Sequence, residues 1–308
     1  MPQATSTSAS DIPKGGWVER LLPPAAQPYA RLARLDRPIG TWLLLFPCWW
    51  SVALAANGLP DAFLFAAFAA GAIVMRGAGC TYNDIVDRDF DGRVARTADR
   101  PIPSGAVTVR QAIAFLLLQL VIGLIILLTF NRTAIGLGVL SLALVFTYPL
   151  MKRVTWWPQF FLGLAFNWGA LMGYAAVTDD LAWPAVILYA GGILWTLGYD
   201  TIYAHQDKED DALIGVKSSA LRLGRRTRPA LFGFYAGTVL LIAAAGWAAG
   251  LAWPFYVFVA AGAAQLVWQA ADVDLDHPAD CLAKFKSNRV FGWLVLAGIV
   301  AGHLAGAA

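Results

Sequence analysis

The chain has 308 residues, of which 58% are hydrophobic and only 14% are charged, with a formal net charge of +3. Soluble domains carry about 25% charged residues, so this composition excludes an ordinary water-soluble enzyme, and intrinsic disorder is excluded because it needs low hydrophobicity. The three cysteines, Cys48, Cys80 and Cys281, are too widely spaced to predict a disulfide framework or a zinc site. The composition therefore predicts an all-α, polytopic membrane protein.

The N-terminal segment is expected to lie outside the folded domain. The first ten residues have neither a basic residue nor an apolar core, which is unlike a signal peptide, and the first arginine is Arg20, which is unlike an Arg-rich mitochondrial leader. We expect residues 1–27 to be a disordered tail. Residues 28–308 are expected to form a single transmembrane domain. At its start, PYARLARLDRP (28–38) alternates Arg31 and Arg34 with leucines, which predicts a short helix lying on the cytoplasmic face of the membrane.

Nine apolar segments follow along the chain. A helix that crosses a bilayer needs about 20 mostly apolar residues, and interruptions by Gly or Pro are tolerated in such helices. The predicted spans are 39–57, 61–82, 109–130, 134–150, 158–177, 182–204, 229–249, 252–271 and 289–307.

The basic residues are concentrated on one side of this arrangement. Nearly all of the 23 Lys and Arg residues fall in the N-terminal tail or in the loops after the second, fourth, sixth and eighth spans. Only Arg132 falls on the opposite side, and Arg76 lies inside the second span. The positive-inside rule therefore predicts a cytoplasmic N-terminus and, with nine spans, a C-terminus on the other side.

An acidic cluster, NDIVDRDFD over residues 83–91, follows the second span. On a helix, Asp84, Asp87 and Asp91 share one face, and Asn83 is in phase with the last two. Three carboxylates along one stripe repel one another, which a sequence tolerates when a cation lies between them. Ligands that are all oxygen atoms indicate a hard ion such as Mg²⁺ rather than zinc.

A second acidic cluster, DKEDD over residues 207–211, follows the sixth span. Asp207 and Asp211 are i, i+4 neighbours on a helix, and Asp200 precedes them by two helical turns. Because four spans separate the two clusters, both are expected on the cytoplasmic side. This spacing also suggests two similar halves, although the sequence has no plain repeat.

Basic residues are interspersed with both acidic clusters. Arg96 and Arg100 follow the first, Lys217 follows the second, and Lys152 and Arg153 lie in a loop between them. Mg²⁺ together with Arg and Lys side chains is well suited to bind a diphosphate. The alternative is a hydrated loop whose charges only solvate one another, as most charge runs do. That alternative does not explain why the acids fall in helical phase twice, directly after apolar spans.

Arg76 is a charged residue within an apolar span, a position that is costly and often functional. It lies seven residues before Asn83 and eight before Asp84, so on a helix it shares their face. It could neutralise an acid, hold an anionic group of a substrate, or form a structural ion pair.

These residues resemble the signatures of a known family, the UbiA superfamily of intramembrane prenyltransferases. Its first signature, NDxxDxxxD, is matched within residues 83–91, and its second, DxxxD, within residues 207–211. The resemblance is greatest to the branch that prenylates 4-hydroxybenzoate in ubiquinone synthesis. The stretches that carry it are 35–50, 76–105, 148–174 and 199–224.

The resemblance implies nine helices around a central cavity that opens toward lipid and is capped by cytoplasmic loops. It implies a magnesium-dependent enzyme that transfers a polyprenyl group from polyprenyl diphosphate to 4-hydroxybenzoate, at the ring carbon ortho to the hydroxyl, and releases diphosphate. The implied location is a bacterial inner membrane, or the mitochondrial inner membrane in a eukaryote. The implied partners are these two substrates and the lipid bilayer, and no nucleic acid.

The resemblance also implies roles for individual residues. Catalysis and metal binding would depend on four aspartates, with an asparagine and a fifth aspartate completing the magnesium shell. Positive charge for the diphosphate would come from four basic residues, and the carboxylate of the acceptor would need a further cation. The aspartates are Asp84, Asp87, Asp207 and Asp211, the shell is completed by Asn83 and Asp91, the diphosphate residues are Arg96, Arg100, Lys152 and Lys217, and the acceptor residues are Arg37 and Arg153.

Other functions remain open. A prenyltransferase for another aromatic acceptor, such as homogentisate, a naphthoate or haem, would use the same acidic motifs. A secondary transporter also has many spans and internal charges, but its polar residues would lie in mid-span, whereas these lie at the ends of spans. A divalent-cation channel would have rings of acids with few basic neighbours.

Overall fold

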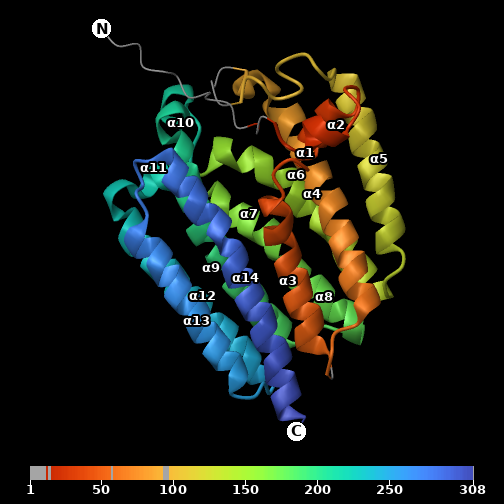
Figure 1. The fold of residues 1–308 in the computed structure, drawn as a ribbon, viewed down its shortest axis with the longest axis vertical. Helices are drawn as coiled ribbons and strands as arrows, with labels where there is room; N and C mark the ends of the chain where they lie inside the picture. Colours follow the sequence, from red (N-terminus) through yellow and green to blue (C-terminus); the bar gives the residue numbers. More distant parts are fainter. Residues whose placement is uncertain (1–11, 13–14, 57, 93–96, 308) are drawn as a thin grey trace. The chain divides into compact units, whose positions relative to one another are not determined.

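The computed structural model describes residues 12, 15–56, 58–92 and 97–307. These residues form α-helices and two single-turn 3₁₀-helices, with no strand among them (Figure 1). The all-α prediction is therefore confirmed. Two compact units can be distinguished: unit 1 comprises residues 1–40 and 73–125, and unit 2 comprises residues 41–72 and 126–308.

Each of the nine predicted spans corresponds to a helix or a helix pair in the part of the chain that the structure describes. Eight are long and apolar enough to cross a membrane, and α3 is a shorter apolar helix. The protein is thus an integral membrane protein, whereas the orientation of its N-terminus and the central cavity stay predictions. The helices are α3 (Ile39–Ala55), α4 (Ala62–Asp91), α5 (Val109–Leu127), α6 (Arg132–Val154), the pair α7 (Pro158–Asn167) and α8 (Gly169–Thr178), α9 (Trp183–Ala204), α12 (Thr227–Ala248), α13 (Pro254–Asp272) and α14 (Pro278–Gly306).

Two helices differ from their predicted spans in an informative way. α4 continues beyond its apolar part through Asp91, so the whole first acidic motif is helical. α14 begins at Pro278 rather than at 289, because its first turns are polar and hydropathy does not detect them. Charged residues at the end of a membrane helix therefore belong to the same rigid element as the span.

Unit 1 is built around a small apolar core under its N-terminal segment. Here α1 (Trp17–Leu21) and α2 (Gln27–Leu32) precede α3, and α1 lies within the segment expected to be a disordered tail. Leu32 of α2 is buried with Ile102, Val107 and Ala112 from the α4–α5 loop and the start of α5. This packing joins the end of α2, close to Arg34, to the α4–α5 loop, which contains Arg100. Of the expected tail, residues 1–11, 13 and 14 lie outside the described residues, and the boundary at residue 27 stays a prediction.

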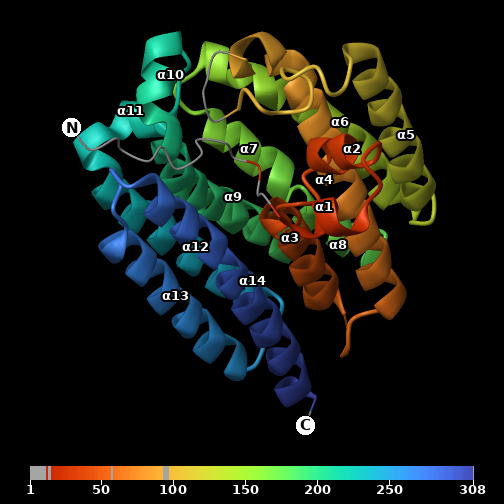
Figure 2. The same ribbon diagram turned by 45° about the horizontal axis from the view of Figure 1, so that its top comes forward.

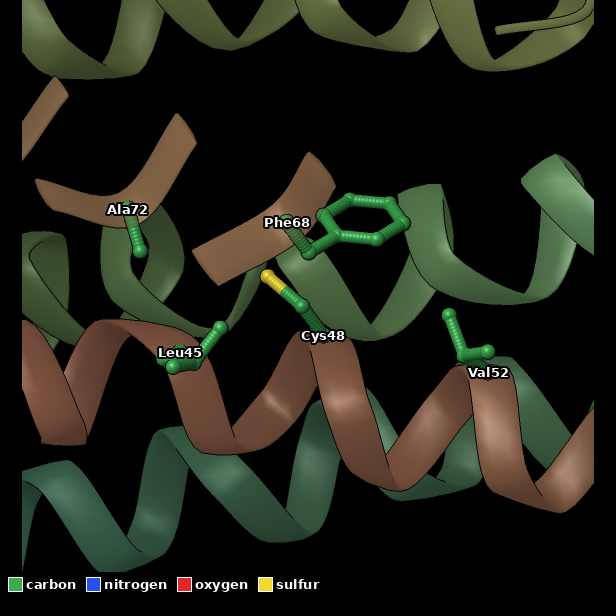
Figure 3. Packing of buried hydrophobic residues seen from close by; sticks show 5 residues of the cluster. All are labelled: Leu45, Cys48, Val52, Phe68 and Ala72. Atoms are coloured by element: carbon green, nitrogen blue, oxygen red, sulfur yellow. The ribbon is translucent and has the colours of Figure 1, made fainter. Parts of the chain in front are cut away.

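In unit 2, α3 packs against the first half of α4. Leu45, Cys48 and Val52 of α3 face Phe68 and Ala72 of α4 in a buried apolar cluster (Figure 3). On another side of α3, the start of α8 approaches very closely, because a Cβ at Gly169 would lie 3.2 Å from the backbone nitrogen of Cys48. The break between α7 and α8 at Trp168 thus coincides with a contact that only glycine permits.

The remaining helices of unit 2 pack through both apolar and polar groups. α12 lies along α9, and α13 lies between α12 and α14 in the contacts that they make (Figures 1 and 2). Trp195 of α9 donates to Asn288 of α14, whose amide donates to Gln269 of α13, and Gln269 also accepts from Tyr235 of α12. Polar groups within a bilayer need such partners, so this network holds four helices in one arrangement.

Candidate active site

The first acidic motif occupies the last turns of α4 in unit 1. Residues 83–91 are helical, so the predicted common face of Asp84, Asp87 and Asp91 is confirmed. These carboxylates are only 0%, 1% and 8% exposed. Buried carboxylates need opposite charges or a metal beside them, so their burial raises the question of what compensates them.

Two arginines compensate this motif. Nη2 of Arg34 donates to Oδ1 of Asp84 over 2.7 Å. Nη1 of Arg100 lies 3.3 Å from the same oxygen and 2.8 Å from Oδ2 of Asp91. Arg100, predicted to bind diphosphate, thus lies beside these acids, whereas its binding of diphosphate stays a prediction. The pairing gives the acidic stripe two fixed positive charges.

The loop that carries Arg100 is anchored to α4. Oγ1 of Thr97 donates to the carbonyl of Asp91 over 2.8 Å, and the N–H of Arg100 donates to the carbonyl of Thr97. A further bond from the N–H of Val107 to the carbonyl of Pro101 closes the loop. Arg100 is therefore held by backbone contacts as well as by its ion pairs. Arg96, also predicted to bind diphosphate, lies outside the described residues.

The carboxylate oxygens of the first motif are suitable ligands for a magnesium ion. Oδ2 of Asp84 is buried and has no hydrogen-bond partner among the described residues. Asp87 follows one helical turn later on the same face, and both residues offer oxygen atoms only. Within the described parts of the chain, no group of three acidic, His or Cys side chains is arranged to hold a metal on its own. Mg²⁺ usually needs only one or two carboxylates, with phosphates and water as its other ligands, and the motif fits that requirement.

The second acidic motif lies in unit 2 and is less regular than its spacing suggested. Asp207 ends the 3₁₀-helix η1 (His205–Asp207), and Asp211 lies in α10 (Lys208–Ile214). Both aspartates are half-buried. The helical pattern expected from Asp200 to Asp211 is interrupted by η1, where Nε2 of His205 is hydrogen-bonded to Oγ1 of Thr227.

A basic residue within the second motif is paired with the α13–α14 loop. Nζ of Lys208 forms an ion pair with Asp276. The hydrogen bond from Lys208 lowers the pKa of the Asp276 carboxyl below its ordinary value. This ion pair joins α10 to the loop between α13 and α14, and so holds the second motif against these two helices.

Lys152 and Lys217, both predicted to bind diphosphate, are brought together in unit 2. The backbone N–H of Lys217 donates to the carbonyl of Lys152 over 2.9 Å. Nζ of Lys217 donates to the carbonyl of Val154 over 3.1 Å and lies 5.9 Å from the ring centre of Trp156. The segment after the second motif is therefore docked on the end of α6.

The predicted acceptor residues belong to different units. Arg37, in unit 1, has its Nε 3.2 Å from Oδ1 of Asp36. Arg153, in unit 2, is exposed at the end of α6. Arg76 lies in α4 with its guanidinium against the backbone of α3, because a Cβ on Gly40 would lie 2.5 Å from Nε of Arg76. Binding of an acceptor by Arg37 or Arg153 stays a prediction.

The residue that sequence reasoning missed is Arg34. The pattern of residues 28–38 predicts a surface helix with Arg34 on its polar side, and α2 is indeed helical. Arg34 nevertheless lies beyond the end of α2, and only 8% of it is exposed. No spacing in the sequence connects it with Asp84, which is fifty positions away.

Comparison with known proteins places the chain in a family. Residues 44–298, most of the chain, match the UbiA prenyltransferase family. The chain belongs to this family. The resemblance seen in the two acidic motifs is thereby confirmed.

Curated relatives of this family cover nearly the whole chain. A protein of Arabidopsis thaliana named "4-hydroxybenzoate polyprenyltransferase, mitochondrial" is 52% identical over 296 residues, which are 95% of this chain and 72% of that protein. A protein of Caenorhabditis elegans with the same name is 50% identical over 304 residues, 98% of this chain and 85% of that protein.

Solved structures of the family share the fold. The apo structure of a UbiA homologue from Aeropyrum pernix K1 is 27% identical and superposes with a TM-score of 0.69, covering 87% of this chain and 98% of that one. A UbiA homologue from Archaeoglobus fulgidus bound to GPP and Mg²⁺ has a TM-score of 0.64 at 16% identity, covering 88% of this chain and 99% of that one. At that identity the second likeness concerns the fold alone.

Proposed function

We propose that this chain transfers a polyprenyl group from polyprenyl diphosphate to 4-hydroxybenzoate, at the ring carbon ortho to the hydroxyl, in ubiquinone biosynthesis. The observation that carries this proposal is the extent of the similarity. Two relatives named for this activity are about half identical to the chain along nearly all of its length. The buried acids and arginines of the first motif supply a physical basis for it.

Magnesium is the metal that we propose for this reaction. Candidate ligands are the oxygen atoms of Asn83, Asp84, Asp87 and Asp91 in the first motif and of Asp207 and Asp211 in the second. Bound Mg²⁺ would act as a Lewis acid on the diphosphate leaving group. A homologue of the same fold is named as bound to a prenyl diphosphate, GPP, and Mg²⁺, which supports this choice.

The chain's own basic residues would hold the diphosphate. Arg100 lies beside the first motif, and Lys217, which follows α10, contacts Lys152 in the last turn of α6. Charge-assisted hydrogen bonds from such groups favour the departing anion. Arg96 is a fourth candidate, by sequence alone. Their positive charge would make scission of the allylic C–O bond easier.

Transfer then needs a dry site and an oriented acceptor. The allylic carbocation left by scission would be attacked by the electron-rich ring carbon, and loss of the ring proton would restore aromaticity. Water would quench the cation, so apolar helices around the isoprenoid chain protect it. Arg37 or Arg153 would bind the acceptor's carboxylate. The site would lie at the cytoplasmic face of a bacterial inner membrane or the matching face of the mitochondrial inner membrane, and the names of the relatives favour the latter.

The test is a reconstituted assay. The purified protein in lipid nanodiscs receives prenyl diphosphates of several lengths, with Mg²⁺ and one of four acceptors: 4-hydroxybenzoate, homogentisate, a naphthoate or haem. We expect a carbon–carbon linked product with 4-hydroxybenzoate, identified by mass spectrometry. No such product in any combination would reject the proposal, and a product with another acceptor would replace it by the runner-up. Substrate movement across proteoliposomes without a covalent product would instead indicate a transporter.

A further inference from the structure

Arg34 has a backbone conformation that arginine rarely adopts. Its φ is 57°, in the left-handed region, and it follows Ala33, the residue that caps α2. Its N–H donates to the carbonyl of Arg31 over 3.0 Å, and the N–H of Leu35 donates to the carbonyl of Ala30 over 2.9 Å. This pair of bonds ends a helix on a left-handed residue, where glycine is usual. An arginine at that position is strained, which points to a use for its side chain.

The same chain uses glycine in comparable positions. Gly215 follows the last residue of α10 in the left-handed conformation, with a φ of 77°, and Gly224 follows α11 (Ser219–Leu223) with a φ of 51°. Among the described residues, Asp179 is the only other non-glycine residue with a positive φ, and its carboxylate accepts a bond from the N–H of Thr133. Where this chain departs from glycine, the side chain therefore has a defined partner.

The partner of Arg34 is the most deeply buried acid of the first motif. Nη1 of Arg34 donates to the carbonyl of Arg31 over 2.9 Å, so the guanidinium is fixed to its own helix end. Nη2 donates to Oδ1 of Asp84 over 2.7 Å. Asp84 has no exposed surface, so this ion pair is shielded from solvent and its attraction is strong.

The charges around this pair constrain metal binding. Oδ1 of Asp84 accepts from the guanidinium groups of both Arg34 and Arg100, so much of its negative charge is already compensated. A divalent cation that bound alone at Oδ2 of Asp84 would lie close to these two positive charges, and this repulsion is unfavourable in a buried site. A diphosphate bound at the same time would remove the excess positive charge.

We propose that Arg34 is the internal counter-ion of Asp84 and makes metal binding depend on the diphosphate. It holds Oδ1 of Asp84 and leaves the buried Oδ2 to the metal, while its charge keeps the affinity for Mg²⁺ low until the diphosphate arrives. This inference rests on the proposed function, because it takes Asp84 as a magnesium ligand. Arg34 acts through Asp84 and is a positioning residue.

The experiment measures metal affinity directly. Mn²⁺ replaces Mg²⁺ as the probe, and electron paramagnetic resonance counts the free ion in titrations of the full-length protein in nanodiscs, with and without inorganic diphosphate. Protein-free nanodiscs titrated in the same way give the reference, because diphosphate itself binds Mn²⁺. Arg34→Gln removes the charge, and Arg34→Lys retains it. Arg31→Gln is the matched control, because Arg31 lies in the same segment and pairs with Glu19 at the surface.

In the wild type, we expect diphosphate to tighten Mn²⁺ binding by at least about tenfold. In R34Q, Mn²⁺ alone should bind at least about tenfold more tightly than to the wild type, and the effect of diphosphate should shrink. R34K and R31Q should behave as the wild type. Damage to the fold would weaken Mn²⁺ binding, so the expected change has the opposite sign to a structural effect.

Three results would overturn the inference. One is a Mn²⁺ affinity of R34Q that is unchanged or weaker, and another is the same tightening in R34K. The third result is tight binding of Mn²⁺ to the wild-type protein in the absence of diphosphate, which tests the inference even if R34Q does not fold. If the wild-type protein transfers prenyl groups and any of these three results is obtained, only this inference is rejected. A wild type without prenyl transfer defeats the proposed function.

Discussion

The indole nitrogen of Trp195 donates a hydrogen bond to Oδ1 of Asn288 over 2.8 Å, and both side chains are completely buried. Trp195 lies on α9 and Asn288 on α14, two helices that are far apart in the sequence. The amide of Asn288 also donates to Gln269 of α13. These hydrogen bonds join α13 and α14 to α9, the helix that precedes the second acidic motif.

Replacing Asn288 with leucine should destabilise the protein. The change leaves the indole N–H of Trp195 without its acceptor in an apolar environment. We expect a loss of about 1–2 kcal/mol, since hydrogen bonds between membrane helices contribute modestly. Unfolding in mixed micelles measures it. Trp247→Phe is a suitable control, because Trp247 is 78% exposed and its replacement should change stability by less than about 0.5 kcal/mol. Equal stability of N288L and the wild type would contradict this prediction.

Asp87 should be needed for metal-dependent activity, and its neighbour Asp89 should not. Asp87 is buried, whereas the Asp89 side chain is 74% exposed and lies beside Arg88. Asp87→Asn should raise the Mg²⁺ concentration for half-maximal prenyl transfer by at least about tenfold, because a metal ligand loses its charge. Asp89→Asn should leave it unchanged. Equal effects of the two substitutions would argue against the predicted ligand set.

Chelation should abolish prenyl transfer reversibly. If Mg²⁺ neutralises the leaving diphosphate, excess EDTA should reduce the rate to background, and added Mg²⁺ should restore it. Zn²⁺ should restore it poorly, because carboxylate oxygens suit harder ions. Product formation at an undiminished rate in EDTA would exclude the metal role. The protein's thermal unfolding in EDTA serves as the control that the fold persists.

A methyl group at Gly40 should impair activity by displacing Arg76. The Cβ that Gly40→Ala introduces would lie 2.5 Å from Nε of Arg76, so the guanidinium must move. We expect about a tenfold loss of prenyl transfer with a stability cost of about 1–3 kcal/mol, as for other overpacked sites. Gly79→Ala on α4 is the control, because its Cβ would meet nothing within 4 Å and alanine favours a helix. Wild-type activity of G40A would show that the position of Arg76 is unimportant.

Removing the charge of Lys217 should weaken binding of the prenyl diphosphate. The side chain is half-buried beside Trp156, and a charge-assisted bond contributes about 1.5–3 kcal/mol. Lys217→Met should therefore raise KM at least about tenfold with a smaller effect on kcat, and Lys217→Arg should retain most of the affinity. Lys286→Met, on an exposed residue of α14, should have no effect. An unchanged KM in K217M would remove Lys217 from the site.

The sequence predicted those features that depend on local periodicity. All nine apolar spans are helical, and the face shared by Asp84 and Asp87 is real because α4 continues without a break through Asp91. The periodicity of the second motif did not reveal the 3₁₀ turn that ends at Asp207. In that turn His205 contacts Thr227, a residue that no local pattern connects with it.

Contacts between distant segments could not be predicted. Arg34 meets Asp84 across fifty positions of the sequence, next to a core in which Leu32 packs against the α4–α5 loop. Lys152 and Lys217 meet where a backbone hydrogen bond joins the last turn of α6 to the loop after α10. In both cases the sequence indicated the chemistry of a residue but not its neighbour.

Because α4 is continuous, the positions of its acidic residues relative to Arg76 depend on the number of residues between them. From Arg76 to Asp84 the helix rises about 12 Å, and each residue turns it by about 100°. A single alanine inserted between these two residues would rotate every acid of the motif away from Arg76. An insertion of four residues would nearly restore the angle but shift the acids by about 6 Å along the axis. The number of residues between Arg76 and Asp84 therefore sets both the distance and the angle between these side chains. Deletions or insertions in this stretch should be tolerated far less than substitutions there.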